Sequence, residues 1–440
     1  MLSNPLPVAT CSPTLATYLQ NAKDNFLKDA QESPESAKKW TVVMGNEAGD
    51  LDSIASAIGY AWFLSESKRE SAIPLIQIAK EDFTLRAENL YALELAGIPN
   101  PQETLLSASD ILDFKPFPTD KFVLVDHNRL GSQYSEGNPQ AKVTGVVDHH
   151  EDEGLYKDTA TPRLIKPSGS ASSLVASLLP SELPAELSTL LLSAIVIDTQ
   201  GLKPGGKATE DDRQAALSLA SNTTLSISTS SFSASSVHEI QPIKDLSEQL
   251  SKKKVDLSHL GGWDLLRRDY KEYTHTLPWA EGQPTIKVGL ATVPVQLKVW
   301  GSKGNLETES LAWMSKRGLT ILGVLTTFRS EKKIKKKAGG KHKREMAWII
   351  LEPSETPGVK LDTAQLADRL WTGIEGSEEL QAKVHKKFWF GKSDTSDNLP
   401  SNAKIRVYKQ KNADATRKAV APLIKAILED SASSSNQAKL

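Results

Sequence analysis

Short apolar runs alternate with helix-period segments along the first half of the chain. Four runs are nearly uninterrupted by polar positions: Trp40–Met44, Ile73–Ala79, Phe122–Val125 and Val143–Val147. Such runs are typical of strands that are buried on both faces of a parallel sheet. Apolar positions recur with the helical period in four further segments: Ser53–Ser65, Leu85–Leu95, Ser170–Leu179 and Leu187–Ile197. This alternation predicts an α/β domain with a doubly wound, mainly parallel sheet.

A segment of small polar residues, SNTTLSISTSSFSASS, interrupts this pattern and predicts a linker over residues 221–240. Beyond it, helices are expected at Lys244–Lys253 and Trp263–Tyr273, and strands at Lys287–Val293, Leu319–Phe328 and Met346–Leu351. We therefore predict an N-terminal domain over residues 1–220, a smaller C-terminal α/β domain over 241–430 and a flexible tail over 431–440.

Composition narrows the class of protein. With 440 residues, 39% hydrophobic and 24% charged, the chain can bury the cores of two or three domains. Its net charge of −1 argues against a globally basic coat for nucleic acid. One cysteine, Cys11, excludes an internal disulfide framework and multi-cysteine zinc modules. No apolar run approaches the length of a membrane span, and the N-terminus does not resemble a secretory signal. We expect a cytoplasmic protein.

Acidic and imidazole residues gather where apolar segments end. The positions are Asp50 and Asp52, Asp126 and His127, Asp148 to His150, and Asp198. Taken singly, such residues are commonly helix caps, turn residues or surface groups. We interpret the four clusters as strand ends, which meet at one edge of a parallel sheet. Carboxylates gathered there repel each other unless cations lie between them, and an oxygen-rich set with imidazole suits Mg²⁺ or Mn²⁺. Paired ions of this kind serve in the cleavage of phosphate esters and anhydrides.

Four segments in this order, GNEAGDLDSIASA, VLVDHN, VVDHH and the segment ending at Asp198, resemble the motifs of the DHH phosphoesterase superfamily. The resemblance implies a parallel-sheet domain with a two-metal centre and a C-terminal domain that closes over the substrate. By position it implies that Asp50 ligates the first metal, and that Asp52, His149 and Asp198 ligate the second. It further implies that Asp126 bridges both ions.

The resemblance also implies residues that face the substrate. His150 would stabilise phosphate charge or assist proton transfer, His127 is placed in the same substrate site, and Asp148 would support the histidines. Family II inorganic pyrophosphatases have a histidine where this chain has Asn46. An amide oxygen favours Mg²⁺ over Mn²⁺ there, and the GNE sequence resembles cytosolic exopolyphosphatases of fungi. Alternatively, Asn46 is only a turn residue after Gly45.

A serine-rich segment, LIKPSGSASSLVASLL, precedes the predicted helix at Ser170–Leu179. A loop of Gly169 and small hydroxyl residues that enters a helix can present backbone N–H groups to an anion, which makes Ser170 a candidate substrate contact. Capping of the helix by Ser168 or Ser170 would explain the same residues.

Two segments of the second domain resemble the DHHA2 domain. WDLLRRDYKEY resembles its helix-end segment, which implies that Lys271 contacts substrate phosphate. ATRKAVAPLIKAIL resembles its S-R-K segment with Thr416 in place of serine, which implies that Arg417 and Lys418 clamp the phosphates. His385 is a further candidate contact. The alternative is that these side chains lie on solvated helix faces.

A basic segment, EKKIKKKAGGKHKRE, spans Lys332–Arg344. It is either a solvated loop or a surface that attracts a polyanion, an effect that weakens with salt. AGGKH resembles the GGGH element of the nucleic-acid-cleaving DHH branch only superficially, because Ala338 and Lys341 break the pattern.

Together these features predict an exopolyphosphatase that removes terminal orthophosphate from linear polyphosphate with two divalent ions, Mg²⁺ or Mn²⁺, and with Co²⁺ in vitro. We expect no nucleic acid or membrane partner, and a monomer rather than an oligomer. The alternatives are an inorganic pyrophosphatase, a prune-like phosphodiesterase of short chains or nucleotides, a DHH nuclease and a non-catalytic phosphate-binding scaffold.

Overall fold

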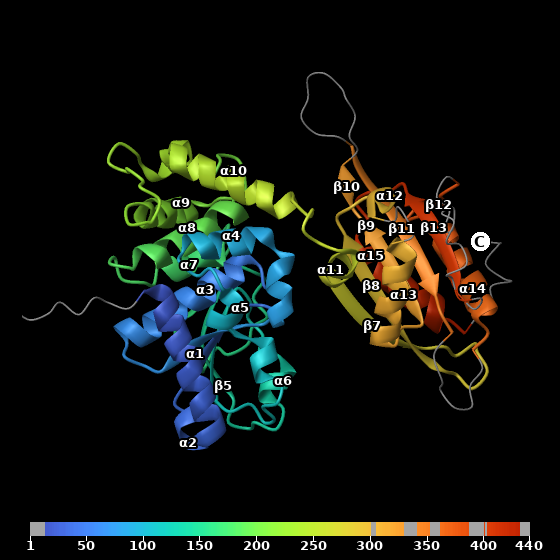
Figure 1. The fold of residues 1–440 in the computed structure, drawn as a ribbon, viewed down its shortest axis with the longest axis horizontal. Coiled ribbons are helices and arrows are strands. Elements are labelled where there is room, and N and C mark those ends of the chain that lie inside the picture. The colour runs from blue at the N-terminus through green and yellow to red at the C-terminus, as the bar shows by residue number, and fades with distance from the viewer. Residues whose placement is uncertain are drawn as a thin grey trace, which may run out of the picture. The chain divides into compact units, whose positions relative to one another are not determined.

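The computed structural model describes residues 14–300, 305–329, 341–352, 361–386, 400 and 403–431. The chain divides into two compact units, one ending at Leu257 and one beginning at Ser258 (Figure 1). Nearly all of the predicted tail lies outside the described residues, as does most of the basic segment, including Lys332, Lys333 and Lys335 to Lys337.

The first unit contains a six-stranded sheet in which every neighbouring pair is parallel. Its order is β3-β2-β1-β4-β5-β6. The strands are β1 (Thr41–Met44), β2 (Ala72–Ile76), β3 (Leu106–Ser107), β4 (Lys121–Val125), β5 (Lys142–Asp148) and β6 (Arg163–Ile165). The four predicted strands are confirmed, and the short strands β3 and β6 add to them. The strand order reverses between β1 and β4, so the loops that leave these two strands border the switch point where such sheets bind ligands.

Helices cover both faces of this sheet (Figure 1). They are α1 (Leu15–Glu32), α2 (Pro34–Ala37), α3 (Leu51–Trp62), α4 (Ala87–Leu95), α5 (Pro101–Thr104), α6 (Ser132–Ser135), α7 (Ala171–Ala176), α8 (Ala185–Asp198), α9 (Glu210–Ala220) and α10 (Gln241–Val255). A short π-helix, η1 (Phe63–Ser67), and three short 3₁₀ helices, η2 (Lys80–Leu85), η3 (Ala108–Ile111) and η4 (Ala234–Glu239), accompany them. Neighbouring strand residues point to opposite faces of the sheet and pack into two separate hydrophobic cores. Val43 and Val123 belong to one core, and Val42 and Phe122 belong to the other. The doubly wound α/β domain is therefore confirmed.

The predicted linker and domain boundary differ from the structure. Val237 and Ile240 are buried in the core of the first unit, and α10 packs against α4 and α8 through Ile243 and Leu246. Apolar residues spaced among the serines are sufficient to anchor this segment. The predicted linker thus belongs to the first unit, and the boundary follows Leu257 rather than residue 240.

The second unit contains a seven-stranded mixed sheet. Its main order is β12-β13-β11-β9-β8-β7, with β10 paired to β11. The strands are β7 (Tyr270–Thr276), β8 (Thr285–Val293), β9 (Ile321–Thr326), β10 (Phe328–Arg329), β11 (His342–Ile350), β12 (Ala382–Val384) and β13 (Lys404–Gln410). The helices are α11 (Gly262–Arg267), α12 (Leu297–Trp300), α13 (Asn305–Arg317), α14 (Thr363–Gly376) and α15 (Arg417–Glu429). The α/β class predicted for this region is confirmed.

The predicted helix at Trp263–Tyr273 is wrong over its second half. Helix α11 ends at Arg267, and the chain continues as β7, which pairs with β8 in antiparallel register from Tyr270 to Thr276. Alternating side chains in YKEYTHT fit a half-exposed edge strand better than a helix. Among the described residues, no helix combines the length and the apolar character that a membrane span needs.

Candidate metal centre

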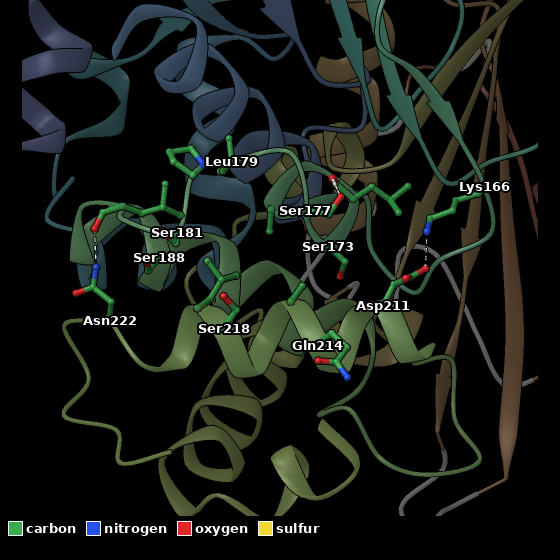
Figure 2. Close-up of a pocket in the computed structure, with 16 residues that line it drawn as sticks. Lys166, Ser173, Ser177, Leu179, Ser181, Ser188, Asp211, Gln214, Ser218 and Asn222 are labelled. Atoms are coloured by element: carbon green, nitrogen blue, oxygen red, sulfur yellow. Dashed lines mark hydrogen bonds and ion pairs between the residues drawn. The ribbon is translucent and has the colours of Figure 1, made fainter. Parts of the chain in front are cut away.

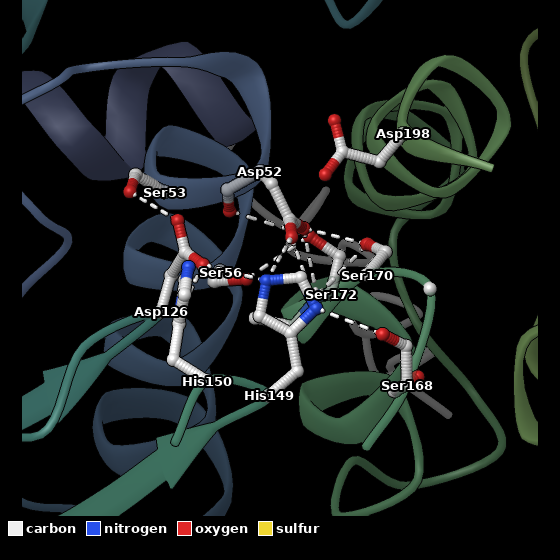
Figure 3. A network of polar contacts seen from close by, with 12 residues as sticks. Asp52, Ser53, Ser56, Asp126, His149, His150, Ser168, Ser170, Ser172 and Asp198 are labelled. Atoms are coloured by element: carbon white, nitrogen blue, oxygen red, sulfur yellow. Dashed lines mark hydrogen bonds and ion pairs between the residues drawn. The ribbon is translucent and has the colours of Figure 1, made fainter. Parts of the chain in front are cut away.

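Loops from the carboxyl ends of β1, β4 and β5 meet at the switch point of the first sheet (Figure 3). A cavity of about 330 Å³ opens there, lined by Asn46, Asp50, Asp126, His149, His150, Ser168, Asp198 and Lys207. The interpretation of all four acidic clusters as strand ends is wrong in one case, because Asp198 is the last residue of helix α8. Its carboxylate nevertheless reaches the same cavity from the helix side (Figure 3).

Asp126 lies at the middle of this site. Its side chain is buried, and its Oδ1 lies 3.1 Å from Nε2 of His149 and 3.7 Å from Nδ1 of His150. Ligand atoms of these three residues all lie within 4.8 Å of one another. Ser53 Oγ and Asn46 Nδ2 donate to the other carboxylate oxygen, at 2.5 and 2.8 Å. Asp126 also has a φ of 60°, a left-handed conformation that non-glycine residues adopt at a cost and that clusters at functional sites.

Asp52 is held by the serine-rich loop at the start of α7. Its Oδ1 accepts hydrogen bonds from Ser170 Oγ at 2.6 Å and Ser172 N at 2.8 Å, and its Oδ2 accepts from Ala171 N at 2.7 Å (Figure 3). Oδ2 lies 3.9 Å from Nε2 of His149. The anion that this loop binds is therefore a carboxylate of the protein itself. Ser170 is fully buried and its hydroxyl is used on Asp52, so a contact with substrate stays a prediction.

A second buried carboxylate, that of Asp212 on α9, also holds the serine-rich loop in place. It accepts hydrogen bonds from Ser168 Oγ at 2.8 Å, Gly169 N at 2.8 Å and Ser173 Oγ at 2.6 Å. A Cβ added at Gly169 would lie 2.6 Å from Oδ2 of Asp212, so this position requires glycine. The carbonyl of Ser168 lies 3.0 Å from Nδ1 of His149. A proton on Nδ1 directed at that carbonyl leaves Nε2 facing Asp126, as in histidines that ligate metals.

Asp148 contacts both His149 and His150. Its Oδ1 accepts hydrogen bonds from the backbone nitrogens of His149 and His150, at 2.8 and 3.2 Å, and lies 2.8 Å from Nδ1 of His150. Burial opposes ionisation of Asp148, but donation from His150 and Asn128 outweighs it and lowers its pKa. The side chain of His150 stays 56% exposed and can face a solute. Nδ1 of His127 contacts the Val125 carbonyl at 3.0 Å, and the residue lines an adjoining cavity of about 500 Å³ that Asp126 and His150 also line.

The crowded carboxylates make the centre electrostatically suited to a cation. Burial, reinforced by the charges of Asp52 and Asp50, raises the pKa of Asp126 to about 7, although the hydrogen bonds with His149 and Ser53 act to lower it. Burial and the charge of Asp52 likewise raise the pKa of Asp198 to about 6. A divalent cation would relieve this repulsion, and carboxylate oxygens with one imidazole form a donor set for Mg²⁺ or Mn²⁺. The residues present therefore fit such an ion.

Asn46 and Asp50 also have structural contacts. Asn46 Nδ2 donates to Asp126, and its Oδ1 accepts from Ala48 N at 2.8 Å in a local turn. The amide oxygen that was expected to serve as a metal ligand is thus engaged by the backbone. Asp50 caps helix α3 by accepting from Ser53 N at 3.1 Å. Both residues nevertheless line the cavity.

The sequence interpretation missed Lys207. This lysine lies in the loop between α8 and α9, and its Nζ is 3.4 Å from Oδ2 of Asp198. Its side chain is 49% exposed and lines the cavity. The sequence does contain a signal for this residue, because Lys207 follows Asp198 by only nine positions. A positive charge beside the acidic cluster can contact a phosphate.

A larger cavity in the first unit, of about 420 Å³, lies between α7, α8 and α9 (Figure 2). Its lining is mainly serine, leucine and alanine, with an ion pair of 2.8 Å between Lys166 and Asp211. The lining contains no group of metal-ligating side chains. The smaller cavity is therefore the candidate site.

In the second unit, the two predicted phosphate-binding segments lie together. Arg417 at the start of α15 contacts Asp269, with Nη1 2.8 Å from Oδ1 and 3.0 Å from the carbonyl oxygen. Lys271 follows on β7 and is exposed, as is Lys418. The side chain of His385 is 12% exposed and its Nε2 lies 3.5 Å from the Glu345 carboxylate, so its contact with phosphate stays a prediction.

Comparison with known protein families agrees with this geometry. Residues 40–195 match the model of the DHH family, N-terminal domain, and residues 248–427 match the DHHA2 domain. The chain carries a DHH domain followed by a DHHA2 domain. The resemblance inferred from the motifs is thus confirmed.

Three curated relatives illustrate the range of similar proteins. A Schizosaccharomyces pombe protein named "Putative exopolyphosphatase" is 28% identical over 93% of this chain and 97% of its own length. Mouse "Exopolyphosphatase PRUNE1" is 25% identical over 69% of this chain and 63% of its own. A "Probable manganese-dependent inorganic pyrophosphatase" of Shouchella clausii is 29% identical over 41% of this chain and 54% of its own.

Proposed function

We propose that this protein is an exopolyphosphatase, a hydrolase that removes terminal orthophosphate from linear inorganic polyphosphate. The observation that carries the proposal is the convergence of Asp126, His149, Asp52 and Asp198 at the switch point, beside a cavity open to solute. The name of the S. pombe relative, which matches over nearly its whole length, supports this substrate over others.

In this proposal the acidic centre holds two divalent cations, Mg²⁺ or Mn²⁺. Their ligands are Asp50, Asp52, Asp126, His149 and Asp198. Such ions, when bound, activate water for attack on phosphorus and offset the charge of the phosphate. Ser53 and Asn46 orient Asp126 through their hydrogen bonds, and the Ser168 carbonyl orients His149.

The other residues bind and orient the terminal phosphate. Asp148 engages Nδ1 of His150, so the opposite ring nitrogen is available to donate to a phosphate oxygen. Lys207 adds a positive charge at the edge of the cavity. Lys271 and Arg417 offset charge on the group that is transferred, as in other phosphoryl-transfer enzymes. The attack breaks one phosphoanhydride bond and releases orthophosphate and a chain shorter by one unit.

Inorganic pyrophosphatase is the second candidate, because the Shouchella relative bears that name and shares the first domain. Asn46 in place of histidine argues against it. A cytoplasmic location, a monomeric state and the absence of nucleic acid partners stay predictions.

The test is phosphate release from pyrophosphate, tripolyphosphate and longer chains of defined length, each with Mg²⁺, Mn²⁺ or Co²⁺. We expect kcat/KM to be higher for the longer chains than for pyrophosphate. Preferential cleavage of pyrophosphate would favour an inorganic pyrophosphatase over an exopolyphosphatase. If no phosphate were released from any of these substrates, the protein would instead be a non-catalytic phosphate-binding scaffold.

A further inference from the structure

Four exposed lysines gather on one face of the sheet in the second unit. They are Lys343 on β11, Lys383 on β12, Lys409 on β13 and Lys411 directly after it, and we call them the lysine patch. Lys383 and Lys409 are directly opposite in the antiparallel pairing of β12 and β13. Residues that are opposite, or two apart along a strand, project from the same face of a sheet.

The pairing of β11 with β13 brings the other two lysines into the same group. Arg344 pairs with Gln410, so Lys343 and Lys411 are the next residues along these two strands. The ammonium group of Lys383, close to Lys411, lowers the pKa of Lys411. The lysine patch therefore places like charges on three adjacent strands.

Nearby acidic groups do not neutralise this patch. The carboxylate on the same face, Glu345, is 5% exposed and is already engaged by Leu297 N at 3.2 Å and by Nε2 of His385 at 3.5 Å. Across the part of the chain that the structure describes, no ion pair involves the four lysines.

Other basic side chains of the same unit do have acidic partners. Arg406 lies 2.9 Å from Glu375 on the opposite face of the sheet, and Arg317 lies 2.5 Å from Glu272. Since like charges opposite each other on a sheet are unfavourable, the lysine patch is suited to an anion supplied from outside.

We propose that the lysine patch binds a linear inorganic polyphosphate chain, separately from the contact expected at Lys271 on β7 of the same sheet. This inference rests on the proposed function and adds a second surface for the same substrate. Adjacent strands are about 4.8 Å apart, and alternate residues of one strand about 6.8 Å. A single phosphate can therefore reach one or two of the lysines, whereas an extended polyanion can reach all four.

The chemistry of the lysine patch favours polyphosphate over single-stranded nucleic acid. Nucleic-acid grooves of this type combine basic residues with aromatic side chains on which bases stack. Apart from the lysines themselves, the described residues paired with the patch in the sheet are Phe328, opposite Lys343, and Glu345, opposite Lys409. They offer one partly exposed aromatic ring, that of Phe328 on the short strand β10. Lysine ammonium groups act as point charges that need no particular orientation of the phosphate.

The position of the patch predicts a dependence on chain length. Lys271 lies on β7, at the opposite edge of the sheet from β12 and five strands away. Five strand spacings amount to about 24 Å. A pyrophosphate bound at Lys271 cannot reach Lys383 on β12, five strands away, or Lys409 on β13, four strands away, so only long chains can gain from these lysines.

The experiment compares two triple variants of the full chain. The test variant carries Lys383→Gln, Lys409→Gln and Lys411→Gln. The control carries Lys39→Gln, Lys121→Gln and Lys142→Gln, which remove the same charge from exposed lysines at the amino ends of the strands of the first unit. Binding of fluorescently labelled long-chain polyphosphate is measured without divalent cation, and phosphate release is measured for long chains and for tripolyphosphate.

We expect the test variant to bind long chains about fivefold more weakly than the control, with a shallower dependence on salt. Its KM for long chains should rise to match, while its kcat/KM for tripolyphosphate stays at the control value. Equal long-chain binding by the two variants would overturn the inference. So would stronger wild-type binding of a single-stranded oligonucleotide, if the test variant lost it. Failure of the wild type to release phosphate would reject the proposed function alone, since the binding measurement is independent of turnover.

Discussion

The two units handle charge in opposite ways. In the DHH domain, buried carboxylates are each fixed by several donors: Asp52 accepts three hydrogen bonds from the loop at α7, and Asp212 holds the same loop from the other side. In the DHHA2 domain, Lys271, Lys418 and the lysine patch are exposed, and Arg417 has a carboxylate partner at 2.8 Å. Ligating an ion requires fixed geometry, whereas holding a flexible polyanion requires mainly charge. Substitutions in the first domain should therefore cost more than those in the second.

Replacing Asp126 should have the largest effect. Asp126→Asn removes the carboxylate whose Oδ1 lies 3.1 Å from Nε2 of His149, at the middle of the cavity. We expect phosphate release to fall by more than about 100-fold, beyond the usual cost of losing a supporting residue. Asp113→Asn on the surface is the control. Calorimetric titration with Mn²⁺ should show weakened binding in Asp126→Asn alone. Unchanged turnover would refute the placement of the active centre.

Replacing Asp212 should have an intermediate effect. Asp212→Asn can replace the carboxylate oxygen Oδ2 by an NH₂ group, which cannot accept the hydrogen bonds that Gly169 N and Thr209 N donate. The serine-rich loop before α7, which holds Asp52 and His149, should therefore loosen. We expect Mn²⁺ affinity to fall by about 10- to 100-fold. The neighbouring Asp211→Asn is a matched control, since Asp211 is 51% exposed and pairs with Lys166.

Thermal unfolding should accompany the titration of Asp212→Asn. The native fold is retained if a cooperative transition persists, and the metal affinity can then be read as a property of the loop. A folded Asp212→Asn variant with the affinity of the wild type would show that the loop does not position the ligands.

Replacing Arg417 should have a smaller effect that falls on substrate binding. Arg417→Lys keeps the charge but loses the planar fork, part of which contacts both the side chain and the carbonyl of Asp269. We expect KM for polyphosphate to rise about tenfold with a lesser change in kcat. Arg317→Lys is the control, because Arg317 also pairs with a carboxylate of this domain, the partly exposed Glu272. Equal KM values in the two variants would contradict the assignment.

The sequence predicted those parts of the site that lie beside strand ends. Asp126 and His149 follow strands β4 and β5 directly, so chain order and sheet topology bring them together. Asp212 could not be found in this way, because its contacts with Gly169 and Ser173 join segments about 40 residues apart that only packing brings together. The strand at Tyr270–Thr276 was missed because its polar alternation carries a weak apolar signal and continues a helical segment.

Replacing Asn46 should have the smallest effect, which is a change in the preference of the acidic centre for Mn²⁺ or Mg²⁺. As an oxygen ligand it would favour Mg²⁺, but the structure has its Nδ2 donating to Asp126 at 2.8 Å and its oxygen accepting from Ala48 N. Asn46→His supplies an imidazole in place of the amide, so we expect the ratio of Mn²⁺-supported to Mg²⁺-supported kcat/KM to rise by about three- to tenfold.

Asn46→Asp separates the two roles of this residue. It keeps an oxygen at the site, removes the N–H donor to Asp126 and adds a negative charge to carboxylates that already raise the pKa of Asp126. If donation to Asp126 is the main role, this variant should lose activity with both metals, and extra Mg²⁺ should not restore it. Restoration by Mg²⁺ would instead identify the oxygen as a ligand. The first outcome would assign Asn46 the orientation of Asp126, and the second would assign it the choice of metal.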